Sequence, residues 1–248
     1  MTATKQNEIL RLGRRFVQHL HNETPLTVLK LGVSKIIVKS LYSFKKWQFK
    51  NRTFNLFNQE LPYFIHDYNA TWRNERCIEI AAAIHFLKQW PKAEFLELGN
   101  VMSYYLNHSH YVVDKYEQSP GIHNIDFARF TPPKIFDGFI SVSTLEHIGW
   151  DETPREVEKV KCCIEKIRNC VRSTDKVFVT FPLGYNEYLD NLVKSKQLPF
   201  QKSAFMVRID ENQNWKEVEL HQALQPEYRY GHRFPFANAC FFGTGLIK

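Results

Sequence analysis

The chain has 248 residues, 44% hydrophobic and 15% aromatic, so it can bury a full core as one domain with an appendage or as two small domains. Its five cysteines form no Cys-x-x-Cys pair, and no His/Cys cluster has zinc-ligand spacing, so we expect reduced thiols and no metal. There is no apolar signal core at the N-terminus and no apolar run of membrane-spanning length, which favours a cytoplasmic protein. The net charge of +7 comes from the front of the chain, because residues 1 to 60 carry net +8.

Residues 26 to 50 have helical periodicity and are rich in lysine. One face holds Val33, Ile37, Leu41 and Phe44, and Lys35, Lys39, Lys46 and Lys50 lie on or near another. Such a basic amphipathic helix suits peripheral contact with an anionic membrane surface, or it packs on the body with solvated lysines. Nucleic-acid recognition through residues 1 to 60 is a further alternative, although the segment contains no recognisable RNA- or DNA-binding motif. We therefore expect residues 1 to 90 to form a basic helical extension or cap.

A second helix is predicted from Thr71 to Trp90, where Pro91 stops it. Its buried stripe comprises Cys77, Ile80, Ala81, Ile84 and Leu87, and Thr71 is available as its cap. The segment just before it and its first turns are unusually polar and aromatic, which either supplies caps and surface ion pairs or belongs to a site.

After Pro91 short apolar strands alternate with helical or polar stretches, the pattern of βαβ units around a parallel sheet. Strands are predicted at 95 to 98, at 111 to 113, at 136 to 143 and at 176 to 181, and a weak one between the second and third of these runs into 124 to 126. Segments at 203 to 209 and 237 to 246 are strand-like, with a possible partner near Trp215. Residues 91 to 248 are therefore predicted to be an α/β domain with a doubly wound, Rossmann-like, seven-stranded sheet and an antiparallel edge.

The helix after the fourth strand is the best-marked element. Thr153, Pro154 and Glu156 fit the N-cap, N1 and N3 positions of a capping box. The stripe that follows comprises Val157, Val160, Ile164, Ile167 and Val171. Since this stripe must lie on the sheet, Cys163 is predicted to be core.

Polar residues follow the ends of three predicted strands, where open α/β sheets bind their ligands. Gly99 permits a tight turn after the first strand, Asp114 can accept from ribose hydroxyls, and Asp126 can accept from the amine of adenine. The pyrophosphate fingerprint G-x-G-x-x-G is absent, since Val101 and Tyr104 occupy its later glycine positions. An adenosine-bearing cofactor without phosphates is predicted.

The residues Glu97-Leu98-Gly99-Asn100, Asp114, Asp126 and the run from Asp137 to His147 resemble the class I S-adenosylmethionine-dependent methyltransferases over roughly residues 92 to 183. The resemblance implies that Glu97, Gly99 and Asn100 lie against the methionine part of the cofactor, that Asp114 holds the ribose and that Asp126 lies by the adenine. The turn with Ser143 and Thr144 would also face the cofactor, and the following Leu-Glu-His would lie where cofactor and acceptor meet. The stretch from Tyr68 to Arg76 is similar to one in a bacterial subset of the family.

Methyl transfer requires an aligned nucleophile and, where needed, removal of its proton. His147 is the first candidate base and Glu146 the second; a capped or structural histidine is the alternative for His147, and the pair alone makes a weak metal site. Candidate acceptor contacts are Tyr68, Asn69, Arg76, Tyr185 and Asn186.

The predicted function is therefore S-adenosylmethionine-dependent methylation of an oxygen or nitrogen nucleophile on a small-molecule or glycan acceptor. The family's first motif has two or three glycines whereas this chain keeps Gly99 alone. That departure motivates the alternative of a non-catalytic adaptor that binds an anionic partner, a membrane surface or nucleic acid, through its basic N-terminal helices.

Overall fold

The computed structural model describes residues 41 to 108 and 110 to 247, and the chain divides into one compact unit of residues 1 to 45 and a second from Lys46 to Lys248. Residues 41 to 48 are helical and residues 49 and 50 form a turn, while residues 26 to 40 of the predicted basic helix lie outside the described residues. The second unit begins at Lys46, whereas the sequence predicts a domain boundary after residue 90. Within the described ranges, no helix combines the length and apolar character that crossing a membrane requires.

The second unit is a mixed α/β fold built on a sheet that has eight strands within the described residues, in the order β5-β4-β3-β6-β7-β10-β8-β9. The parallel strands are β3 (Phe95–Leu98), β4 (Tyr111–Val113), β5 (Ile122–His123), β6 (Gly138–Val142) and β7 (Val177–Pro182). The antiparallel strands are β8 (Phe200–Arg208), β9 (Trp215–Val218) and β10 (Ala239–Leu246). The predicted count of seven strands is exceeded because β9 pairs with β8.

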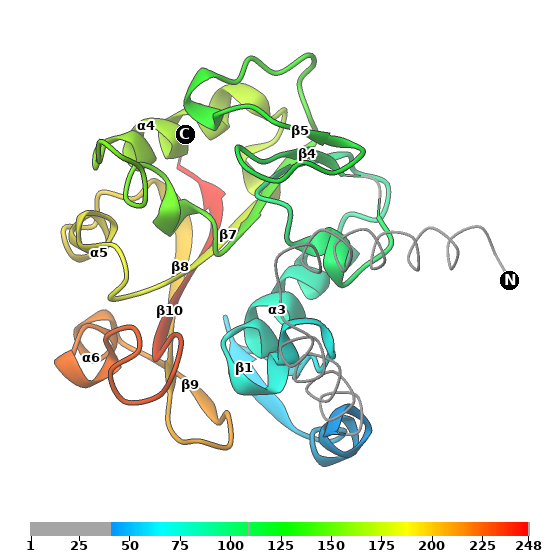
Figure 1. Ribbon diagram of the computed structural model, residues 1–248, viewed down its shortest axis with the longest axis vertical. Helices are drawn as coiled ribbons and strands as arrows, with labels where there is room; N and C mark the ends of the chain where they lie inside the picture. Colours follow the sequence, from blue (N-terminus) through cyan, green and yellow to red (C-terminus); the bar gives the residue numbers. More distant parts are fainter. Residues whose placement is uncertain (1–40, 109, 248) are drawn as a thin grey trace, which may run out of the picture. The chain divides into compact units, whose positions relative to one another are not determined.

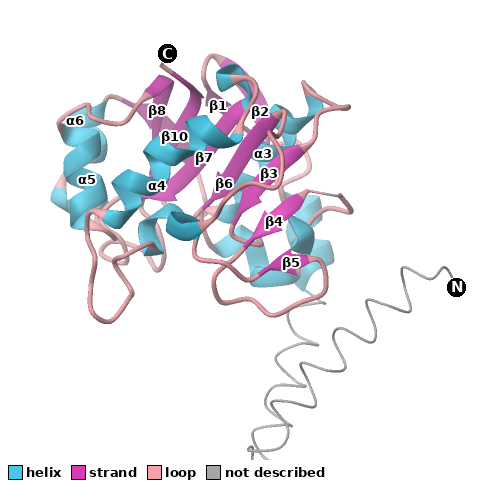
Figure 2. Ribbon diagram, turned by 90° about the horizontal axis from the view of Figure 1, so that it is seen from above, coloured by secondary structure: helices cyan, strands magenta, loops and turns pink. Residues whose placement is uncertain are grey.

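Helices cover both faces of this sheet, as the fully buried strands β6 and β7 require. One face packs against α4 (Lys159–Ile167), α5 (Glu187–Lys194) and the short α6 (Leu220–Ala223), whose apolar residues share one core cluster with the sheet. The other face packs against α3 (Arg76–Lys88), where Phe86 stacks on Phe178 of β7 at 5.2 Å between ring centroids. Figures 1 and 2 show α3 and the α4/α5 pair on opposite sides of the sheet.

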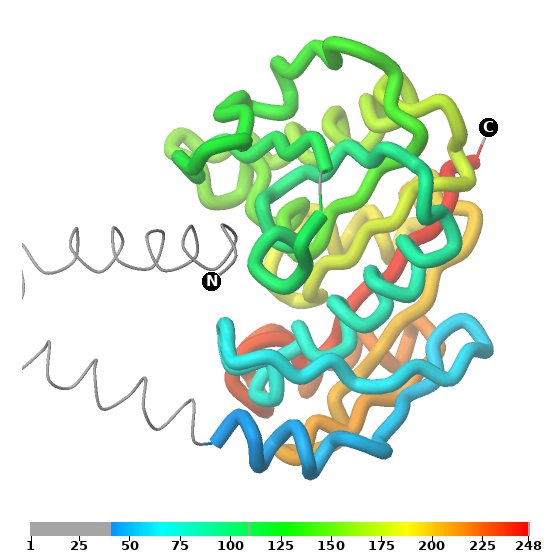
Figure 3. The backbone as a smooth tube through the Cα atoms, turned by 90° about the vertical axis from the view of Figure 1, so that its right-hand side faces the viewer, coloured from blue at the N-terminus to red at the C-terminus, as the bar shows by residue number. Residues whose placement is uncertain are grey.

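A two-stranded hairpin precedes α3 and lies beside the far edge of the sheet (Figure 3). Its strands are β1 (Thr53–Leu56) and β2 (Gln59–Pro62). The backbone N–H of Phe57 donates to Glu217 of β9 at 2.8 Å, and the Arg52 guanidinium donates to the Asn212 carbonyl at 2.7 Å. The connecting segments contain short 3₁₀ helices: η1 (Tyr68–Arg73), η2 (Met102–Tyr104), η3 (Phe127–Arg129), η4 (Leu145–His147), η5 (Arg168–Cys170), η6 (Thr174–Lys176) and η7 (Pro226–Tyr228).

Two predicted helix starts are wrong. The helix predicted from Thr153 begins at Lys159, because the Glu156 N–H donates to the Gly149 carbonyl at 2.8 Å and folds the preceding residues back on that turn. The helix predicted from Thr71 begins at Arg76, because the Thr71 hydroxyl donates to the Phe64 carbonyl and accepts from the His66 N–H. The prediction that Cys163 belongs to the core is confirmed, since its side chain is fully buried.

Candidate functional site

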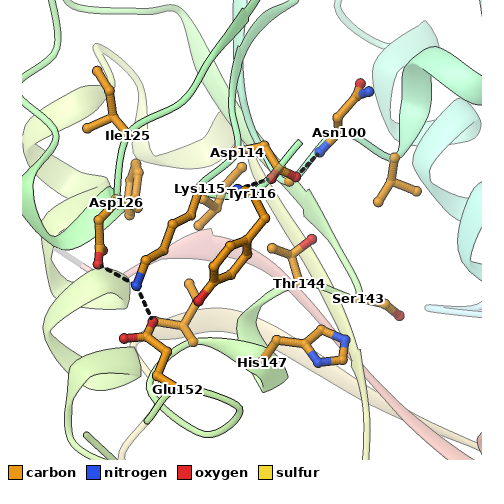
Figure 4. Close-up of a pocket in the computed structure, with 15 residues that line it drawn as sticks. Asn100, Asp114, Lys115, Tyr116, Ile125, Asp126, Ser143, Thr144, His147 and Glu152 are labelled. Atoms are coloured by element: carbon orange, nitrogen blue, oxygen red, sulfur yellow. Dashed lines mark hydrogen bonds and ion pairs between the residues drawn. The ribbon is translucent and has the colours of Figure 1, made fainter. Parts of the chain in front are cut away.

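A cavity of about 270 Å³ opens at the carboxyl ends of β3, β4 and β6 (Figure 4). It lies where the chain order of the sheet reverses, since β3 has β4 on one side and β6 on the other. Its lining comprises Leu98, Gly99, Asn100, Val101, Asp114, Lys115, Tyr116, Ile125, Asp126, Phe127, Ser143, Thr144, His147, Ile148 and Glu152. Seven residues singled out from the sequence, Gly99, Asn100, Asp114, Asp126, Ser143, Thr144 and His147, therefore come together.

The floor of the cavity depends on a close approach between the turns that follow β3 and β6. Gly99 has φ of +81°, and its N–H donates to the Val113 carbonyl at 2.9 Å. A Cβ at this position would lie 2.0 Å from the Thr144 hydroxyl oxygen. Glycine is therefore required both by the backbone conformation and by the lack of space.

Glu97 lies behind the loop and is not part of the cavity wall. Its Oε1 accepts from the backbone N–H groups of Val101 at 3.0 Å and Met102 at 2.7 Å, and the side chain is buried. Two N–H groups at the start of the loop are thus taken by a carboxylate. Glu97 shapes the loop, whereas the family resemblance implies a position against a cofactor.

Asp114 joins the loops after β3 and β4. Its Oδ1 accepts from the backbone N–H groups of Tyr116 at 2.9 Å and Glu117 at 2.8 Å, and its Oδ2 accepts from the Asn100 N–H at 3.1 Å. Because a carboxylate oxygen accommodates about two hydrogen bonds, Oδ2 keeps capacity for a donor from the cavity.

Asp126 is held by two lysines at the opposite wall, and Figure 4 shows one of them, Lys115. Its Oδ2 lies 2.6 Å from Lys159 Nζ and 3.1 Å from Lys115 Nζ, and both lysines also pair with Glu152 at 2.6 and 3.0 Å. Burial alone would raise the pKa of Asp126, but hydrogen bonds from Lys159 and Lys115 hold it below the usual value. Sequence reasoning missed Lys115, Lys159 and Glu152, although Lys115 directly follows Asp114.

His147 stands at the cavity rim with a fixed ring orientation. Its Nδ1 lies 2.6 Å from Asp151 Oδ2, and the Tyr185 hydroxyl donates to the same oxygen at 2.8 Å. The His147 side chain is 48% exposed, and its Nε2 lies 3.6 Å from Glu146 Oε1. A carboxylate on Nδ1 favours the tautomer in which Nε2 is the acceptor, the form that a general base needs. The sequence offers one signal for Asp151, its spacing of four residues from His147.

A buried polar cluster lies beyond the turn that contains Ser143. Glu79 of α3 is fully buried; it accepts from the hydroxyls of Ser143 and Thr180, each at 2.7 Å, and pairs with Arg76 at 3.3 Å. Arg76 also donates to the Val142 carbonyl at 3.3 Å. The Ser143 hydroxyl is thus bonded to Glu79, and Arg76 serves buried acids without lining the cavity.

Glu146 belongs to the same side of the turn. It is 2% exposed, its Oε2 makes no hydrogen bond within the described residues, and burial raises the pKa of its carboxyl well above the usual value. Asn186 caps α5 by accepting from the Leu189 N–H and donates to the Glu146 carbonyl at 2.9 Å. Asn186 is therefore a structural residue of this turn.

Tyr68 and Asn69 lie outside the cavity. Tyr68 stacks on Tyr104 with 4.3 Å between ring centroids, and the Asn69 carbonyl accepts from the Asn74 side chain at 2.9 Å. Of the five residues considered for acceptor binding, Tyr185 is linked to the cavity rim, through Asp151 and His147. The other four do not line the cavity.

No family model matches this sequence, and no curated protein matches it. Among solved structures, the chain is similar to the structure of a "putative methyltransferase" from Thermoplasma acidophilum, with 15% identity and a TM-score of 0.31 over 63% of this chain and 68% of that chain. At this level of similarity, the activity has to be argued from the residues of the chain itself.

Proposed function

We propose that the cavity at the ends of β3, β4 and β6 binds S-adenosylmethionine and that the chain transfers the methyl group to an oxygen or nitrogen nucleophile. The observation that carries this proposal is the hydrogen bonding of the loop after β3, where two backbone N–H groups are bonded to a carboxylate of the chain itself. In dinucleotide-binding folds, the N–H groups at this point bind a pyrophosphate. Here the N–H groups of Val101 and Met102 are taken by the Glu97 carboxylate, which would also repel phosphate. An adenosine cofactor without phosphates fits this loop better.

The remaining polar groups of the cavity suit an adenosyl ligand. Asp114 Oδ2 has room for a ribose hydroxyl, and the network of Asp126, Lys115 and Glu152 borders the place where the base would lie. Lys115 already engages Asp126, so an adenine amine would need Lys115 to shift toward Glu152. The negative charge of Asp114 complements the positive charge of a sulfonium cofactor.

The chemistry would be an in-line displacement. S-adenosylmethionine would supply the electrophilic methyl group, and His147 Nε2 would accept the proton that the acceptor oxygen or nitrogen loses on methylation. Asp151, which holds Nδ1 at 2.6 Å, would stabilise the resulting imidazolium. On the basis of the sequence, we also propose that the acceptor is a small hydroxyl- or amine-bearing molecule or a glycan, and that the protein is cytoplasmic.

The binding step is tested by titration calorimetry of the full chain with S-adenosylmethionine and S-adenosylhomocysteine. One site per chain is expected, and Asp114→Ala should weaken binding by about 10- to 100-fold, the loss expected for hydrogen bonds to a charged group. Asp114→Asn tests the charge with less disturbance of the loop. Asp175→Ala is the matched control, because Asp175 is exposed at the other end of the sheet and bonds Gln201.

Two results separate the outcomes. Absence of binding by either compound, or equal affinity in Asp114→Ala, refutes the cofactor site. Binding without transfer of tritiated methyl groups to any hydroxyl or amine acceptor in a broad panel would favour a non-catalytic adaptor. Where transfer is observed, Asp151→Asn should lower kcat with little change in KM, because it disturbs the His147 tautomer and not the binding of substrates.

A further inference from the structure

Three potential metal ligands converge behind the cavity, on residues that the proposed reaction does not use. Glu97 Oε2 lies 3.0 Å from His110 Nδ1 and 3.4 Å from His108 Nε2, and ligand atoms of the three residues all lie within 4.8 Å of one another. The side chains are 1%, 10% and 12% exposed for Glu97, His110 and His108. His108 Nε2 is buried and makes no hydrogen bond within the described residues.

The cluster lies at the end of the connection between β3 and β4, which has little regular structure within its described residues. The connection from β3 to β4 contains only the three-residue η2 within its described residues, where doubly wound folds place a full crossover helix. His108 and His110 lie at the end of this connection, just before β4, and Glu97 lies in β3. A bond between them would hold the connection against the sheet in place of helix packing.

Hydrogen bonds do not satisfy every buried polar atom of the cluster. His110 Nδ1 is within hydrogen-bond distance of Glu97, but His108 Nε2 is not bonded to it despite being buried. The two imidazole rings stack with 3.7 Å between centroids. His108 Nδ1 accepts from the His110 N–H at 3.1 Å, so the ring is not doubly protonated. A buried, neutral imidazole beside a carboxylate and a second imidazole is a metal-binding arrangement.

We propose that Glu97 Oε2, His108 Nε2 and His110 Nδ1 bind a divalent metal ion, with Zn²⁺ as the best fit. Two His and one Glu form a known zinc-ligand set, and bonds of about 2.0–2.1 Å at tetrahedral angles separate ligand atoms by about 3.4 Å. The two distances from Glu97 Oε2, 3.0 and 3.4 Å, are close to this spacing, and the stacked imidazole rings would have to rotate for both nitrogens to face the ion. Metal binding at Nε2 would move the His108 proton to Nδ1 and give up one backbone hydrogen bond, a small loss against three ligand bonds.

The ion would have a structural role. None of the three ligands lines the cavity, and the other Glu97 oxygen, Oε1, holds the N–H groups of Val101 and Met102. The metal would therefore fix the orientation of Glu97 and, through it, the loop after β3. Because the ligands lie outside the cavity, the site stands whether or not S-adenosylmethionine binds.

The test uses the full chain with any affinity tag removed. Protein purified from zinc-containing medium should hold about one zinc per chain by mass spectrometry of the metal. Dialysis against a chelator should lower Tm, and added Zn²⁺ should restore it. Co²⁺ added to the stripped protein should give the visible absorption bands of a four-coordinate site.

Substitution of a ligand should have a larger effect than loss of an outer hydrogen bond, which typically costs 10–100-fold in metal affinity. His108→Ala and His110→Ala are therefore each expected to lower zinc affinity by more than about 100-fold. His221→Ala, on the exposed surface of α6, is the matched control and should bind as the wild type does. Stoichiometric zinc absent from the wild type, with Tm unchanged by chelator and by Zn²⁺, would overturn the proposal even if the variants fail to fold.

Discussion

Replacement of Gly99 by alanine tests whether the contact between the two turns determines the cavity floor. The residue has φ of +81°, where a side chain costs about 1–2 kcal/mol. Its new Cβ would also lie 2.0 Å from Oγ1, 2.7 Å from Cγ2 and 2.8 Å from Cβ of Thr144, and overpacking of this kind costs about 1–3 kcal/mol. Gly99→Ala should therefore destabilise the chain by about 2–5 kcal/mol in total.

The two contributions can be separated with variants that the chain itself offers. Gly121 has φ of +84° with nothing within 4 Å of the position that a Cβ would take, so Gly121→Ala should cost only the backbone contribution of about 1–2 kcal/mol. In a Thr144→Ala background, two of the three close contacts at residue 99 disappear. Gly99→Ala should then cost less than it does in the wild type but more than Gly121→Ala, because Cβ of residue 144 still lies 2.8 Å from the new Cβ.

The measurement is urea denaturation followed by tryptophan fluorescence, with Tm as a second probe. A double-mutant cycle gives the coupling free energy between residues 99 and 144, and about 1–3 kcal/mol is expected. Equal costs of Gly99→Ala in the wild-type and Thr144→Ala backgrounds would refute the packing argument. A cost of Gly99→Ala no greater than that of Gly121→Ala would do the same.

Three further predictions concern stability. Burial raises the pKa of the Asp190 carboxyl to about 6, above its value of about 4 in the unfolded chain. The protonated side chain therefore contributes fully to the free energy of unfolding below about pH 4, and this contribution is lost as pH rises through about 6. Asp190→Asn should raise Tm at pH 8 by up to the equivalent of about 3 kcal/mol and change it less at pH 5; an equal shift at both pH values would contradict this. Arg76→Met should cost about 3–5 kcal/mol in urea denaturation because it leaves the buried Glu79 without its cation, and Glu79→Gln in the same chain should recover much of the loss. Phe241→Ala should also cost about 3–5 kcal/mol, since this 1% exposed ring stacks on Phe181 at 4.6 Å; a loss below about 1 kcal/mol, measured the same way, would show that the core refills the space.

Much of the sheet could be predicted because its signals are local. Short apolar runs that end at Gly99, at Asp114 and at Pro182 correspond to β3, β4 and β7, and their polar ends meet at one edge of the sheet. Side chains near a strand end therefore reach the same cavity whatever their distance in sequence. Gly99, Asp114 and Thr144 come together for this reason.

The remaining features depend on pairings between distant residues. Thr153 and Glu156 satisfy the local pattern of a capping box, yet the hydrogen bond from Glu156 to Gly149 prevails and the helix begins later. The ion pairs of Lys115 with Asp126 and Glu152 likewise depend on the tertiary fold. The sequence shows that these residues are charged, but it does not show which of them form ion pairs.

The turn after β6 links the cavity to the buried acids, and its backbone conformation depends on contacts from both. Ser143 has φ of +41°, a conformation that costs a residue with a side chain about 1–3 kcal/mol. Two hydrogen bonds and one packing contact hold it there: its N–H donates to the Thr180 carbonyl, its hydroxyl donates to Glu79, and the next residue packs on Gly99. Each of these partners comes from a different element, namely β7, α3 and the loop after β3. The strained turn therefore positions His147 relative to the cavity with contacts from three sides, and the buried Arg76–Glu79 pair helps to hold that turn.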